Sequence, residues 1–218
     1  MEPFIYNHQY NFIKQQAFQL QKNYLQVKDE SVISAVKANA EEKILAQFEG
    51  LTNQQRQMLG LIIDLKQEQD FHNYLHSLSS YILSFPSVSE DTLRKLFKKN
   101  KKLNLPALEE IDFSKLTYLG WNDISLQKKF IVYEQNGQWI GIEGKYTPAR
   151  HKNICFFCQK QTKVSFVSAV TNATSTSDPN YYKSLGHYIC SDSQECNENI
   201  THLAALENFM EKVKEPTV

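Results

Sequence analysis

The four cysteines of this 218-residue chain form two closely spaced pairs in its C-terminal third. Two residues separate Cys155 from Cys158, and five separate Cys190 from Cys196. A short turn can direct two thiolates at one ion, and a second pair beside it completes the tetrahedral set of four ligands that zinc prefers. Because sulfur would then occupy every coordination position, none is left for a catalytic water. The pattern therefore predicts a structural Zn²⁺ held by all four cysteines.

Other uses of these cysteines fit the sequence less well. Disulfides need an oxidising compartment, and residues 1–10 lack the basic start, apolar core and small-residue cleavage site of a secretory signal. A thioredoxin-like redox site would place its Cys-x-x-Cys early in a βαβ unit and would leave the second pair unexplained. One alternative stays open because the second pair is widely spaced: His187 or His202 could replace one of its cysteines as a ligand.

The remaining sequence carries no catalytic signature. The zinc-deaminase and His-Glu-x-x-His patterns, a Gly-rich phosphate loop and a Gly-x-Ser-x-Gly elbow are all missing. We therefore expect a protein that acts by binding and is not an enzyme.

Composition limits the classes of partner. Lysine plus arginine and aspartate plus glutamate each number 24, so the formal net charge is zero. A general nucleic-acid-binding protein carries a positive surplus, so any basic surface must be local. No stretch approaches the roughly 18 consecutive apolar residues of a membrane helix. Together with the missing secretory signal, this predicts a cytoplasmic protein without membrane contact.

Residues 1–86 predict a bundle of four antiparallel helices joined by short turns. Apolar residues recur at helical spacing in four stripes, which are Ile13-Ala17-Leu20-Tyr24, Ile33-Val36-Ala40-Ile44, Leu59-Ile62-Ile63 and Phe71-Leu75-Leu78-Ile82. Thr52 and Gln55 form a capping-box pattern before the third stripe, and Pro86 ends the fourth helix. Four helices with one apolar face each can bury those faces only against one another.

Residues 87–118 predict a short helix from Ser89 and a basic linker. Six cations lie within nine residues, namely Arg94, Lys95, Lys98, Lys99, Lys101 and Lys102. Leu105-Pro106 favours extended chain, as expected at a junction between domains. The cations can form a solvated helix end, or they can contact an acidic protein or the phosphates of ribosomal RNA.

Residues 119–218 predict the zinc-finger domain. Asn136-Gly137 lies between two β-branched and aromatic runs and indicates a hairpin. A strand is predicted over 164–170, a polar loop over 172–180, and one helix after Cys196 with Ile200, Leu203, Met210 and Val213 inward and Leu206 at the stripe's edge. The predicted fold is α+β: a four-helix bundle followed by an α/β domain with a treble-clef-like, four-cysteine zinc finger.

Several strings in this order resemble the FusB-type fusidic-acid-resistance, elongation factor G-binding proteins. They are I-Y-N-H-Q-Y-N-F-I at 5–13, L-F-K-K-N-K-K-L-N-L-P at 96–106, G-W-N-D at 120–123, and the two cysteine pairs. The resemblance covers essentially the whole chain. It implies a monomer that binds elongation factor G, on or off the ribosome, and promotes release of the factor from ribosomes stalled by fusidic acid, without destroying the drug.

The resemblance also implies three partner-binding residues, Tyr188, Phe209 and Lys183. The residues alone leave alternatives open, because Tyr188 can pack against the zinc site and Phe209, expected at the rim of the last helix, can simply widen the core. The rival function is a zinc-finger protein that binds ribosomal or other RNA directly through the basic run at 94–102.

Overall fold

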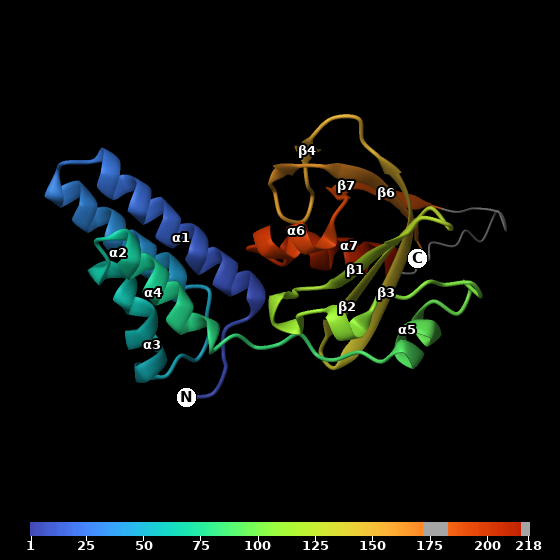
Figure 1. Ribbon diagram of the computed structural model, residues 1–218, viewed down its shortest axis with the longest axis horizontal. Helices are drawn as coiled ribbons and strands as arrows, with labels where there is room; N and C mark the ends of the chain where they lie inside the picture. The colour runs from blue at the N-terminus through green and yellow to red at the C-terminus, as the bar shows by residue number, and fades with distance from the viewer. Residues whose placement is uncertain (172–182, 215–218) are drawn as a thin grey trace. The chain divides into compact units, whose positions relative to one another are not determined.

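The computed structural model describes residues 1–171 and 183–214 (Figure 1). The chain divides into two compact units, Met1–Leu83 and Ser84–Val218. The polar loop predicted over 172–180 lies outside the described residues. Within the described ranges, none of the helices has both the length and the apolar character needed to cross a membrane.

The first unit is helical, as predicted. It contains α1 (Asn7–Gln26), α2 (Glu30–Leu45), α3 (Asn53–Gly60), a 3₁₀ turn (Leu61–Asp64) and α4 (Glu68–Ser79). The third helix is short because the chain tightens into the 3₁₀ turn after Gly60. Its capping box is confirmed, since Gln55 N donates to Thr52 Oγ1 and Thr52 N donates to Gln55 Oε1.

One hydrophobic cluster joins these helices. Its fully buried members come from each of them: Ile13, Ala17 and Leu20 on α1, Ile44 on α2, Leu59 on α3 and Leu78 on α4. Helix α1 packs against α2 and α4, and α2 packs against α3. The apolar stripes are therefore buried against one another, as the helical spacing predicts.

The second unit is built on a five-stranded antiparallel sheet in the order β1-β2-β3-β6-β7 (Figure 1). Its strands are β1 (Leu119–Asp123), β2 (Lys128–Gln135), β3 (Gln138–Pro148), β6 (Val164–Val170) and β7 (Ser184–Cys190). A small separate sheet contains β4 (Asn153–Ile154) and β5 (Gln161–Thr162). The predicted hairpin joins β2 to β3, and Asn136 and Gly137 take the left-handed φ values of 53° and 78° that such a tight turn needs.

The sheet buries different residues on its two faces. On β2, Phe130 and Val132 join a cluster with Phe97, which directly follows α5 (Glu90–Leu96), whereas Ile131 and Tyr133 join the cluster that contains the cysteines. Helix α5 packs on β3, and two 3₁₀ turns follow it (Leu108–Glu110 and Phe113–Lys115). Residues 87–118, which the sequence indicates as a short helix and linker, thus contribute a buried layer to the second unit.

The prediction of a single helix after Cys196 is wrong in detail. The structure has two helices, α6 (Ser193–Asn199) and α7 (Ala204–Lys214), with a break after Asn199. The predicted phase included residues before the break, so it placed Leu206 at the edge of the stripe. In the structure Leu206 is fully buried, and the inward face of α7 comprises Leu206, Phe209, Met210 and Val213.

Candidate metal centre and the sheet surface beside it

The four cysteine sulfurs lie within 4.8 Å of one another, and all four residues are buried. The Sγ atoms of Cys155 and Cys196 are 3.8 Å apart, and those of Cys158 and Cys190 are 3.6 Å apart. Four sulfurs at about 2.3 Å from a central zinc lie about 3.8 Å from one another in a tetrahedron, whereas a disulfide needs about 2.05 Å. The donor set therefore fits a tetrahedral metal and not a pair of disulfides.

Two different local structures present the two pairs. Cys155 and Cys158 sit in the turn between β4 and β5, where Cys155 N donates to Lys160 O and Gln159 N donates to Cys155 O. Cys190 is the last residue of β7, and Cys196 lies in α6, whose N-cap Asp192 accepts from Gln194 N. The wide spacing of the second pair is thus the length of a tight turn plus the first turn of a helix.

Neither histidine considered from the sequence belongs to this group. Among the described residues, the metal-ligand cluster consists of the four cysteines. The His187 ring instead stacks on Phe156, with ring centroids 3.7 Å apart and planes 7° from parallel. His187 therefore supports the turn from outside.

Electrostatics favours a cation at the centre of this cluster. Hydrogen bonds from the other three thiols, that of Cys158 foremost, lower the pKa of Cys155, while Cys155 in turn raises the pKa values of Cys190 and Cys196. Without a cation the four groups must share protons, because adjacent thiolates repel one another. A bound Zn²⁺ would allow all four to be thiolates.

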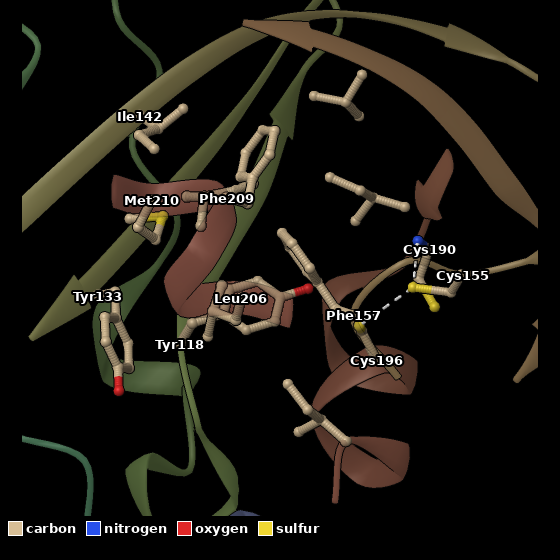
Figure 2. Close-up of a cluster of buried hydrophobic side chains, with 14 of the residues drawn as sticks. Tyr118, Tyr133, Ile142, Cys155, Phe157, Cys190, Cys196, Leu206, Phe209 and Met210 are labelled. Atoms are coloured by element: carbon tan, nitrogen blue, oxygen red, sulfur yellow. Dashed lines mark hydrogen bonds between the residues drawn. The ribbon is translucent and has the colours of Figure 1, made fainter. Parts of the chain in front are cut away.

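Asn197 and Tyr118 secure the cluster from the side of β1. The Asn197 side chain accepts from the backbone N of Thr117 and of Tyr118, and it donates to Tyr118 O and Ser193 O. The fully buried Tyr118 hydroxyl has no hydrogen-bond partner among the described residues and points toward Phe157 and the cysteines (Figure 2). A metal-bound thiolate at Cys196 would give this donor an acceptor.

Lys129 places a buried positive charge beside the same cluster. Its side chain is completely buried, and its Nζ donates to Asn122 Oδ1 at 3.2 Å and to Ser191 O at 3.3 Å, next to Cys190. Burial lowers the pKa of Lys129 to about 8, a shift that the nearby thiolates oppose, Cys196 most strongly. The ammonium offsets part of the negative charge that four thiolates bring to one divalent metal. Sequence reasoning missed this buried charge. Alternation along β2 puts Lys129 on the same face as Ile131 and Tyr133, where an apolar residue is expected, and a lysine at such a position is the signal that could have found it.

The predicted partner-binding residues have different environments. Tyr188 is 41% exposed on β7 and forms an edge-to-face pair with Phe166, which is 43% exposed on β6, with ring centroids 5.5 Å apart. Lys183 is exposed just before β7, and its carbonyl accepts from Thr171. Sequence reasoning missed Phe166, although its outward position follows from alternation along the strand.

The expectation that Phe209 lies at the exposed rim of the last helix is wrong. The side chain is 1% exposed and packs edge-on against Phe157 and His187, at centroid distances of 5.6 and 5.9 Å. Figure 2 shows it inside the cluster together with Met210 and Leu206. Phe209 therefore supports the Cys155–Cys158 turn from within the core and cannot touch a partner in this structure.

Together, a helical unit and a sheet unit with a strand, turn and helix around four thiols define a two-unit protein of the treble-clef zinc-finger class. The family model for the N-terminal domain of elongation factor G-binding protein matches residues 4–86, and that for the FBP C-terminal treble-clef zinc-finger matches residues 92–217. The chain belongs to this elongation factor G-binding family, and the FusB-type resemblance is confirmed.

One solved structure agrees over nearly the whole chain. It is described as the structure of the fusidic acid resistance protein FusC, with 29% sequence identity and a TM-score of 0.80, covering 96% of this chain and 97% of that chain. A search of curated proteins found no match.

Removing the metal should unfold the second unit and leave the first intact. Structural zinc contributes on the order of 10 kcal/mol to the folding of such domains, which exceeds the usual stability margin. Both tryptophans, Trp121 and Trp139, lie in the second unit, so their fluorescence reports on it alone. We expect a strong chelator to change this fluorescence while most far-UV helical signal persists, and Cys155→Ser or Cys190→Ser to behave like the chelated protein. A native spectrum with full metal content in either variant would contradict the ligand assignment.

Replacing Lys129 should loosen the metal without removing a ligand. Mutation of a group that interacts with metal ligands without binding the metal typically lowers metal affinity 10- to 100-fold. We therefore expect Lys129→Met to release zinc to a chromogenic chelator at least about tenfold faster. Lys128→Met is the matched control, because Lys128 lies on the opposite face of β2 and pairs with Glu143. Equal release rates for the two variants would contradict a role for the Lys129 charge.

Proposed function

We propose that this protein binds elongation factor G and promotes release of the factor from ribosomes stalled by fusidic acid, thereby giving resistance by protecting the target. The observation that carries the proposal is the pair of family matches, to elongation factor G-binding domains, at residues 4–86 and 92–217. The likeness to a fusidic acid resistance protein over nearly the full length of both chains supports the same function.

The activity would be binding, with no bond made or broken. A ligand shifts a conformational equilibrium only by its differential affinity for the two states. The protein must therefore bind a released or release-prone conformation of the factor more tightly than the conformation that fusidic acid traps. A rigid binding surface suits this role because little free energy is spent on ordering it.

The exposed aromatic pair on β6 and β7 is the best candidate for the contact. Aromatic residues dominate interface hot spots, and exposed apolar side chains that gather on one face mark interaction sites. Gly186 keeps the pair in place: an added Cβ there would collide with the Phe166 ring, so glycine lets that ring lie across β7 beside Tyr188. Val170 is also exposed on the same face of β6, and we include Lys183 in the proposed surface.

The proposal is tested by release of elongation factor G from fusidic-acid-stalled ribosomes, measured by sedimentation. We expect the zinc-loaded protein to move the factor into the unbound fraction. Tyr188→Ala and Phe166→Ala should each weaken binding by more than about 1 kcal/mol and reduce release, with the melting temperature unchanged. Ile124→Ala is the control, because Ile124 is an exposed apolar residue of the same unit between β1 and β2.

Two results would contradict the proposal in different ways. If the wild-type protein leaves the factor on the ribosome, the release function is wrong. If release occurs but the aromatic variants match Ile124→Ala, the function stands and the contact lies elsewhere.

A further inference from the structure

A lysine-lined cavity opens beside the aromatic pair in the second unit. Its volume is about 480 Å³, and its walls come from α5 and the residues after it, from β2 and β3, from β6 and from the end of α7. Five of the lining residues are lysines: Lys98, Lys99, Lys128, Lys145 and Lys214. Glu143 is the only lining carboxylate among the described residues.

The cavity forms where two strands of the sheet separate. The ladder between β3 and β6 ends at the pair Lys145 and Ser168. Strand β3 nevertheless reaches back to Gln138, and β6 continues to Val170. Gly141 to Glu143 line one side of the resulting gap, and Ser168, Val170 and Thr171 line the other. The opening is therefore part of the sheet architecture and does not depend on one side-chain rotamer.

The charge in this cavity is more than the fold requires. Lys128 and Lys145 are direct cross-strand partners on β2 and β3, and like charges in that arrangement destabilise a sheet. Glu143 relieves one of them, since Lys128 Nζ lies 2.7 Å from Glu143 Oε1. No ion pair within the described residues offsets Lys98, Lys99 or Lys145. The chain as a whole has zero formal charge, so this is a local concentration of positive charge.

The cavity and the aromatic pair share one face of the sheet. Alternation along β6 places Phe166, Ser168 and Val170 on the same side, and the last two line the cavity. Tyr188 lies opposite Phe166 on β7, and Lys145 lies opposite Ser168 on β3. A partner that covers the two rings therefore reaches Lys145 and, one strand further, Lys128 without leaving this face.

We propose that the cavity receives an acidic segment of the same protein partner that covers Phe166 and Tyr188. The inference rests on the proposed function, because that partner is elongation factor G. The Lys128–Glu143 pair shows that a carboxylate already fits beside these lysines. The shared face favours one protein partner for both features.

Two triple variants with equal charge loss test the inference. Lys98→Gln/Lys99→Gln/Lys145→Gln removes three lysines from the cavity, and Lys95→Gln/Lys101→Gln/Lys102→Gln removes three from the same basic run outside its lining. Each full-length, zinc-loaded protein is titrated with purified elongation factor G at low and at high salt. We expect the cavity variant to lose about tenfold or more in affinity at low salt, with a smaller loss at high salt, and the control to change less than about twofold.

Folding and binding are separated by a melting curve of each variant. The cavity variant should be at least as stable as the wild type, because it removes the repulsion between Lys128 and Lys145. Equal losses of affinity in the two triples would overturn the inference while leaving the proposed function intact. Absence of binding by the wild-type protein would overturn the proposed function and the inference together.

RNA binding is measured in parallel with a labelled RNA hairpin. The inference predicts that the cavity variant and the control bind this RNA equally. If the cavity variant loses affinity for RNA with a reduced salt slope, yet keeps its affinity for elongation factor G, then the cavity is a phosphate-backbone site and the inference is wrong.

Discussion

Four thiolates cannot lie within 4.8 Å of one another without a cation, and the second unit is organised around this constraint. The turn between β4 and β5, the end of β7 and helix α6 contribute the four cysteines and come together at this cluster. The thiols are also members of the hydrophobic cluster that buries Phe157, Leu206 and Phe209. Metal binding and core packing are therefore coupled, and the hydrogen bonds of Asn197 and Lys129 hold the connecting backbone in place.

The same constraint positions the proposed partner surface. Tyr188 lies two residues before Cys190, and its carbonyl accepts from Phe156 N, inside the Cys155–Cys158 turn, at 2.7 Å. One side of β7 is thus tied to the metal centre, while the Tyr188 ring faces outward against Phe166. Phe209 contributes indirectly, because it packs against Phe157 from the core side of the turn. A structural metal can in this way control binding without contacting the partner.

Features encoded by local pattern were predictable from the sequence. The helical stripes, the Asn136-Gly137 hairpin and the strand over 164–170 depend on neighbouring residues, and the spacing of the cysteines predicts that the four thiols lie together. Features that depend on where a helix breaks or on which distant segments pair were not predictable from the sequence. The break before α7 changed the helical phase, which moved Leu206 inward and buried Phe209. The burial of Lys129 and the separation of β3 from β6 depend on long-range pairing, which strand propensity does not specify.

The most direct test of this account is a calorimetric titration of the full-length protein into purified elongation factor G, without ribosomes or RNA, before and after removal of zinc. The account predicts saturable one-to-one binding by the zinc-loaded protein and loss of that binding on chelation, because the surface around Tyr188 depends on the metal centre. No binding by the zinc-loaded protein, or equal binding by the metal-free protein, would contradict it.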